Sequence, residues 1–152
     1  LREDGERLDE HVQPGTGSTD WILGLSGVYV TGPTSSLFSS VQARRPGAND
    51  AGYKYGEVSL ANFGYERKLG SAVDAVIELN ARHAARDRTD ETGARDPNTG
   101  GGLVYFTPKV VVRVTRSLVA RFSAQITLIK SLNGDQIERP VYGAGLTWVV
   151  GN

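Results

Sequence analysis

The chain has 152 residues, and its 17 basic and 17 acidic residues leave no net charge. This balance disfavours nucleic-acid binding, which usually leaves a basic excess. The absence of cysteine excludes disulfides, cysteine-ligated zinc and thiol chemistry. No apolar run reaches the roughly 18 residues of a membrane-spanning helix. Strands that alternate polar and apolar residues escape such a hydropathy scan.

Several segments show a period-two alternation of apolar and polar side chains. In segment 72–86 the odd positions from Val73 to Ala81 are apolar, whereas Asp74 and Glu78 occupy even positions. A helix would spread these two sets around its circumference, but a strand places them on opposite faces. The same criterion predicts about seven strands in the chain. They cover residues 21–30, 36–45, 53–68, 72–86, 103–115, 118–130 and 141–150.

Segment 103–115 keeps the alternation but contains Pro108. Proline lacks the backbone N–H that a strand ladder needs, so it is usually confined to edge strands or bulges. We therefore expect a β-bulge at Pro108.

The connections between the predicted strands alternate in length. Leu69-Gly70-Ser71 and Arg116-Ser117 are tight turns, whereas residues 46–52, 87–102 and 131–140 form longer polar loops. Short turns on one side and long loops on the other are typical of outer-membrane barrels, whose short turns face the periplasm. The sequence therefore predicts an all-β fold, an antiparallel up-and-down transmembrane β-barrel. A soluble sandwich or barrel with the same alternation is the alternative.

With seven strands, the first one, residues 21–30, begins on the long-loop side. Closed bacterial barrels usually have an even number of strands, with both chain ends on the short-turn side. Residues 1–20 are expected to form an extracellular loop or a partial strand, and residues 21–152 the barrel strands. Either residues 1–12 supply an eighth strand, or the chain is part of a larger barrel. Leu1-Arg2-Glu3-Asp4 does not form a signal peptide, so we expect either that a signal peptide has been removed or that more sequence lies upstream.

A series of loop and turn motifs is similar in order and spacing to one known family. The motifs are His11-Val12-Gln13-Pro14-Gly15-Thr16-Gly17-Ser18-Thr19-Asp20, Tyr53-Lys54-Tyr55-Gly56-Glu57, Asn98-Thr99-Gly100-Gly101, Val104-Tyr105-Phe106-Thr107-Pro108, Leu132-Asn133-Gly134-Asp135-Gln136 and Tyr142-Gly143-Ala144-Gly145-Leu146. Together they span most of residues 11–150 and resemble the outer-membrane, transporter-like family labelled "meta-pathway of phenol degradation". The resemblance implies passage of small, aromatic molecules and brings no catalytic residues. The ending Val149-Val150-Gly151-Asn152 departs from the terminal aromatic of many such barrels.

Two sets of side chains are candidates for functional roles. Charged and amide groups on one face of the strands could line a wet lumen and set its charge preference, or pair and fill a narrow interior. Aromatic residues near strand ends are expected at the two membrane interfaces. The lumen-lining candidates are Asp74, Glu78, Arg82, Lys109, Arg113, Arg121 and Gln125. The aromatic-belt candidates are Trp21, Tyr29, Tyr105, Tyr142 and Trp148.

Other motifs indicate no chemistry of their own. Gly15-Thr16-Gly17 lacks the third glycine and the preceding strand of a dinucleotide-binding loop. The acidic residues of loop 87–102 alternate with arginines and do not have EF-hand spacing, which favours a solvated loop. His83 falls on the apolar parity of its strand, and the sequence shows no Ser/His constellation around it.

The leading hypothesis is a porin-like channel or transporter of the bacterial outer membrane for small, aromatic or hydrophobic solutes. It requires no enzymatic activity, cofactor or metal. A structural barrel that scaffolds a partner protein and a soluble ligand-binding β-barrel are the alternatives. The expected partners are the lipid bilayer, a small solute, and either further copies of the chain or another protein, but not nucleic acid.

Overall fold

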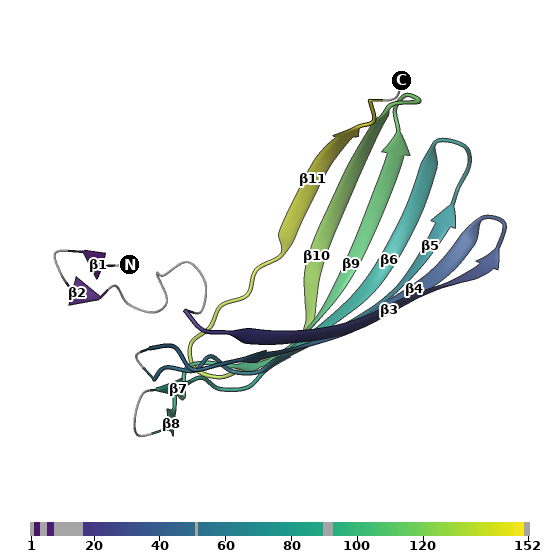
Figure 1. Cartoon of the computed structure of the whole chain (residues 1–152). Helices are drawn as coiled ribbons and strands as arrows, with labels where there is room; N and C mark the ends of the chain where they lie inside the picture. Colours follow the sequence, from purple (N-terminus) through teal and green to yellow (C-terminus); the bar gives the residue numbers. More distant parts are fainter. Residues whose placement is uncertain (1, 4–5, 8–16, 51, 90–92, 151–152) are drawn as a thin grey trace.

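The computed structural model describes residues 2–3, 6–7, 17–50, 52–89 and 93–150 (Figure 1). Seven strands form one antiparallel sheet in the order β11-β10-β9-β6-β5-β4-β3. Each strand pairs with the sheet strand that precedes or follows it in the chain, so the sheet is an up-and-down meander. Its strands are β3 (Asp20–Gly32), β4 (Ser35–Pro46), β5 (Val58–Lys68), β6 (Val73–Ala84), β9 (Gly101–Arg113), β10 (Leu118–Leu132) and β11 (Val141–Trp148).

The predicted all-β class and the seven predicted strands are confirmed. The main difference in bounds is at β5, which begins at Val58 rather than at residue 53. Tyr53 and its neighbours instead belong to the preceding connection, where they bond to other loop residues. Among the described residues, no helix is long and apolar enough to cross a membrane.

Residues 1–12 do not add a strand to the sheet where the structure describes them. β1 (Arg2–Glu3) and β2 (Glu6–Arg7) pair only with each other. The remaining residues of the predicted eighth strand lie outside the described part of the chain. The outer strands of the sheet are therefore β3 and β11.

The connections alternate in length as predicted (Figure 1). The tight turns after β3, β5 and β9 lie at one end of the sheet, and the longer connections after β4, β6 and β10 lie at the other. The connection between β6 and β9 contains a short hairpin of β7 (Arg88–Thr89) and β8 (Ala94–Arg95). The chain thus enters β3 at the long-loop end and leaves β11 at the tight-turn end.

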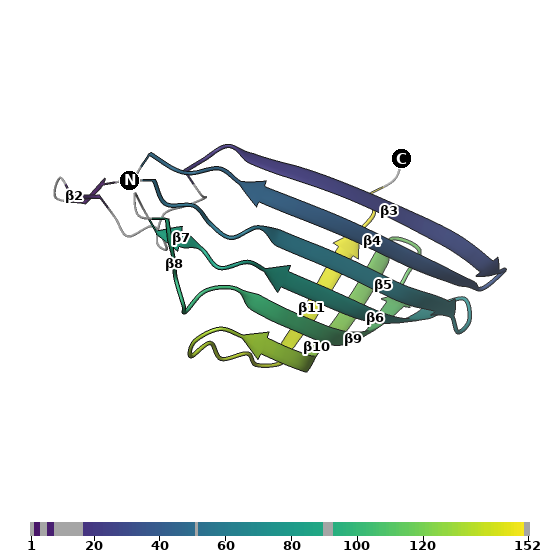
Figure 2. The same cartoon turned by 90° about the horizontal axis from the view of Figure 1, so that it is seen from below.

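The sheet is strongly twisted and curved, so that its first and last strands run in different directions (Figures 1 and 2). A right-handed twist between adjacent strands is normal, and it accumulates over seven strands. Among the described residues the sheet is nevertheless open, because β3 pairs only with β4 and β11 only with β10.

The β-bulge expected at Pro108 was a wrong prediction. Pro108 pairs in register with Ile77 of β6, and the β9–β10 register is unchanged from Lys109 to Phe106 on either side of it. Only the ladder pairing with β10 is interrupted there. The β9–β10 ladder lacks two residue pairs there, between Lys109–Ser123 and Phe106–Ile126. No extra residue has to be absorbed, so the register is the same on both sides of Pro108. The irregularity of β10 lies further on, between Thr127 and Ile129.

The described sheet is a single layer, so few side chains are buried. Among the strand residues, Val76 and Leu103 are 8% and 4% exposed, whereas many apolar side chains remain open to the surroundings. Packing on the less exposed face is close at Gly64, where an added Cβ would lie 2.1 Å from the Phe38 ring. Strand pairing, rather than a two-layer core, therefore holds this part of the molecule together.

Candidate functional site

The strand register places all the lumen-lining candidates on one face of the sheet, called the polar face below. Asp74 of β6 pairs with Val111 of β9, which pairs with Arg121 of β10. Glu78 pairs in the same way with Thr107, two residues from Lys109. Because side chains alternate along each strand, these pairings fix which residues share a face. The same register puts Arg82, Arg113 and Gln125 on the polar face.

Two ion pairs connect β6 and β9 on the polar face. Lys109 Nζ donates to Glu78 Oε1 at 2.5 Å, and Arg113 bonds to the Asp74 carboxylate. Both carboxylates are more enclosed than their partners: Asp74 and Glu78 side chains are 5% and 11% exposed, against 38% and 36% for the two cations. The carboxylates are therefore largely enclosed while the cations stay partly solvated, so removing a cation would leave an enclosed carboxylate without its partner.

An amide and hydroxyl ladder runs beside the ion pairs. Asn62 Nδ2 of β5 donates to Asn80 Oδ1 at 2.6 Å, and Asn80 Nδ2 donates to Thr107 Oγ1 at 3.1 Å. Asn62 Nδ2 also lies 3.4 Å from Glu78 Oε2, which links the ladder to the ion pair with Lys109. These amide and hydroxyl residues are not among the lumen-lining residues predicted from the sequence. Asn80 and Thr107 could have been selected, because each has the parity of the charged residues on its own strand.

The remaining candidates extend the polar face toward β11 and the long-loop end. Arg121 bonds to the hydroxyl of Thr147 on β11, and Gln125 pairs with Val141. Arg82 lies one row nearer the loops, opposite Leu103. Arg82 and Gln125 line a hollow of about 620 Å³ with several polar groups, whereas Arg121 lies outside its lining. Its lining includes Asn62, Glu78, Asn80, Arg82, Tyr105, Thr107, Lys109 and Gln125.

The polar face carries more basic than acidic side chains. Asp20 and Arg44, at the loop end, form a third ion pair at 2.5 Å. The acidic residues of the face are Asp20, Glu66, Asp74 and Glu78. The basic residues are Arg44, Lys68, Arg82, Lys109, Arg113, Arg121 and Lys130. This excess favours interaction with anions over cations.

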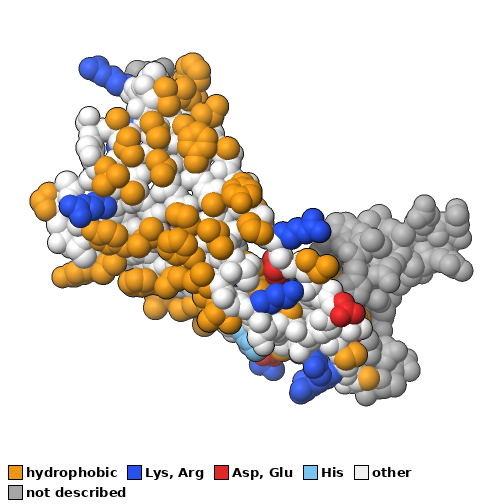
Figure 3. All heavy atoms as spheres, turned by 180° about the vertical axis from the view of Figure 1, so that it is seen from behind, with side chains coloured by type: hydrophobic (Ala, Val, Ile, Leu, Met, Phe, Trp, Pro, Cys, Tyr) orange, Lys and Arg blue, Asp and Glu red, His pale blue; other side chains and the backbone are white. Residues whose placement is uncertain are grey.

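The opposite face of the sheet, called the apolar face below, is covered with exposed hydrophobic side chains (Figure 3). Leu23 and Tyr142 are 80% and 79% exposed, whereas Asp74 and Thr107 of the polar face are 3% and 5% exposed. On β6 and β9 the polar face is therefore the more enclosed side of the sheet, whereas Ile22, Val28 and Val30 of β3, on the same face, are 61%, 72% and 70% exposed. In Figure 3, blue Lys and Arg side chains lie toward the margins of the hydrophobic area.

Four of the aromatic-belt candidates lie on the apolar face, and Tyr105 does not. Tyr29 and Trp148 lie toward the tight-turn end, where Trp148 pairs with Leu118. Trp21 lies at the long-loop end, and Tyr142 near the start of β11. Tyr105 pairs with Asn80 and Thr127, so it belongs to the polar face. Strand parity, not the type of side chain, decides which face a residue occupies, so Tyr105 does not share a face with the other four.

Two loops at the long-loop end are joined through Asp87. Its carboxylate accepts hydrogen bonds from the Tyr53 hydroxyl and the Gly56 N–H, both at 2.7 Å. Burial, followed by the hydrogen bond to Asp87, raises the pKa of the Tyr53 phenol above its ordinary value. The carboxylate of Asp87 thus has a structural role in this loop cluster, and Asp90 and Glu91 lie outside the described residues.

No group of three or more His, Asp or Glu side chains that could hold a metal ion occurs among the described residues. His83 lies on the apolar face, opposite Ser59 and Gly102. The groups that the polar face offers are paired carboxylates, amides, hydroxyls and cations. Such groups can solvate ions and small polar molecules.

No family model, curated protein or solved structure matches the chain. The resemblance to the outer-membrane transporter-like family therefore stays a prediction.

Proposed function

We propose that this chain forms part of a membrane-spanning β-barrel of a bacterial outer membrane, and that its polar face lines a channel for small polar or anionic solutes. The observation that carries the proposal is the separation of the two faces. Large apolar side chains such as Leu23 are left open on one face, while ion pairs and amides gather on the other. A bilayer would cover the first face, and water the second.

The strand lengths support a bilayer as the cover of the apolar face. β6 has 12 residues, which at ~3.3 Å per residue gives a length of about 40 Å. A tilt of about 40° reduces its span to roughly 30 Å, the thickness of the hydrocarbon core. The aromatic side chains Trp21 and Trp148 then lie toward opposite ends of this span.

A membrane location also makes a demand on the edges of the sheet. Unpaired backbone groups cost several kcal/mol each in hydrocarbon, so only closed barrels cross a bilayer with strands. β3 and β11 must therefore pair with each other or with further strands in the membrane. A wider barrel leaves more room for solute, since about eight strands are filled by their own side chains.

The charges on the polar face favour anionic solutes. Glu78 and Asp74 each have a cationic partner, whereas Arg82 and Arg121 lie on this face without an ion pair among the described residues. Small aromatic carboxylates combine the anionic group that this face favours with the aromatic character that the family resemblance implies. Neutral hydrophobic solutes are the less favoured class, because they would displace water from charged groups without pairing with them.

Planar-bilayer recording of the purified protein tests this proposal. We expect stepwise conductance and, in a salt gradient, a reversal potential of the sign that indicates anion preference. Protein that inserts into the bilayer but conducts nothing would exclude a channel. It would favour the second candidate, a structural barrel whose interior is filled by ion pairs such as Glu78–Lys109.

A further inference from the structure

A basic hollow of about 780 Å³ lies at the long-loop end of the sheet. Its cationic side chains come from two separate connections, with Lys54 in one and Arg86, Arg88 and Arg95 in the other. Glu57 is the one acidic residue among its described lining, and its carboxylate is 3.2 Å from Arg45. The hollow therefore concentrates positive charge in a chain that has no net charge overall.

The backbone holds these cations in place. Lys54 and Arg88 exchange two backbone hydrogen bonds, of 3.0 and 2.8 Å. Asp87, next to Arg88, binds both the Tyr53 hydroxyl and the Gly56 N–H. Two connections that are distant in sequence are thus fixed side by side, so the clustering does not depend on flexible side chains meeting by chance.

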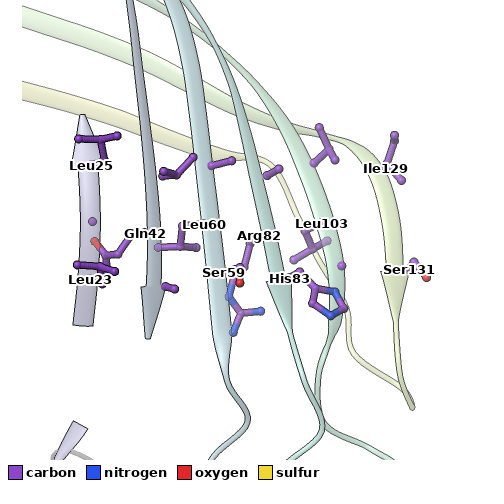
Figure 4. Close-up of a pocket in the computed structure, with 17 residues that line it drawn as sticks. Leu23, Leu25, Gln42, Ser59, Leu60, Arg82, His83, Leu103, Ile129 and Ser131 are labelled. Carbon is purple, nitrogen blue, oxygen red and sulfur yellow. The ribbon is translucent and has the colours of Figure 1, made fainter. Parts of the chain in front are cut away.

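An apolar hollow of about 840 Å³ adjoins the basic one (Figure 4). The two hollows share His83, Gly102 and Ser131, which form one row across β6, β9 and β10 on the apolar face. Figure 4 shows the apolar hollow extending from Leu23 of β3 to Ile129 of β10. Side chains between them are small: its lining includes Ala43, Ser59, Ala61, Ala81 and Gly102.

We propose that the two hollows together bind a phosphate-bearing lipid, with an acyl chain in the apolar hollow and the phosphate against the cations of the basic one. The inference rests on the proposed function, which places the apolar face in a bilayer. Charge complementarity identifies the ligand: Lys54 and the three arginines suit a phosphate. A free anion would leave the adjoining apolar hollow unused, whereas a neutral lipid would leave the cations without a counter-charge.

Tryptophan quenching by brominated lipid tests the proposal. Trp21 pairs with Arg45, which contacts Glu57 of the basic hollow, whereas Trp148 lies near the tight-turn end of the sheet. The variant Trp148→Phe therefore reports on the proposed site, and Trp21→Phe reports on a distant part of the same face. Each is reconstituted in phosphatidylcholine vesicles with a small fraction of brominated phosphatidic acid or brominated phosphatidylcholine.

We expect brominated phosphatidic acid to quench Trp21 at a several-fold lower mole fraction than brominated phosphatidylcholine does, with no such preference for Trp148. The combined substitutions Arg86→Gln, Arg88→Gln and Arg95→Gln should abolish the preference, since each cation near an anionic lipid contributes on the order of fivefold. The matched control removes three cations at the tight-turn end. It combines Arg67→Gln, Lys68→Gln and Arg116→Gln, and the preference should remain.

Three outcomes would overturn the lipid site. The first is equal quenching of Trp21 by both lipids, and the second is a preference for phosphatidic acid that survives loss of the three arginines. The third is loss of the preference in millimolar inorganic phosphate, since this loss would indicate a free-anion site. Quenching of neither tryptophan by any brominated lipid would instead refute the membrane location itself. Gel mobility with and without heating checks that each variant is folded.

Discussion

The ion pair between Glu78 and Lys109 gives a quantitative test of the environment of the polar face. At an N–O distance of 2.5 Å, the gross Coulomb attraction is about 1.7 kcal/mol in water and about 6.6 kcal/mol at an effective dielectric constant of 20. Desolvation and side-chain ordering offset most of it. Because Glu78 is 11% and Lys109 36% exposed, we expect a net coupling of about 1–2 kcal/mol, between a surface and a buried pair.

The coupling is measured by a double-mutant cycle of Glu78→Gln, Lys109→Met and their combination. Urea unfolding in lipid vesicles, followed by tryptophan fluorescence, gives the free energy of unfolding of each variant. We expect each single substitution to lower the free energy of unfolding. The double substitution should lower it by less than the sum of the two single effects. Strict additivity, within about 0.3 kcal/mol, would contradict a partly enclosed polar face and indicate a fully solvated one.

Three further predictions concern single residues. Tyr53→Phe should lower the free energy of unfolding by about 1 kcal/mol below pH 10. Because the folded pKa of Tyr53 is raised, the wild-type advantage should be fully present below the unfolded pKa, near 10, and decline as pH rises beyond it. Gly56→Ala should destabilise the loops by about 1–3 kcal/mol, visible as faster proteolysis, because the added Cβ would lie 1.9 Å from the Ala85 carbonyl oxygen. Arg82→Glu should shift the reversal potential toward cations, and an unchanged potential would exclude Arg82 from the conduction path.

The strands could be predicted from the sequence because period-two alternation is a local property. β6 illustrates this: Asp74 and Glu78 differ in parity from Val73 and Ile77, and the structure places the two sets on opposite faces. Tight turns such as Leu69-Gly70-Ser71 were equally visible. Alternation alone does not say which face is enclosed, and the curvature of the sheet supplies that information.

Contacts between distant segments could not be predicted in the same way. Asn62 was missed because segment 53–68 alternates poorly, so its parity gave little signal until β5 was paired with β6. The basic hollow was missed because Arg86, Arg88 and Arg95 alternate with acids in sequence. Only the backbone pairing of Lys54 with Arg88 brings the second connection beside them.

In the proposed membrane location, the apolar face contacts lipid and the polar face contacts water. Because the chain has no cysteine, single cysteines can be introduced without further changes along β6, at Ile77, Glu78, Leu79 and Asn80. Spin labels at these positions in vesicles report their collisions with oxygen, which partitions into lipid, and with a water-soluble nickel chelate. We expect alternation, with labels at 77 and 79 favouring oxygen and labels at 78 and 80 favouring the chelate. Equal access of the chelate to all four positions, or the inverse alternation, would contradict it.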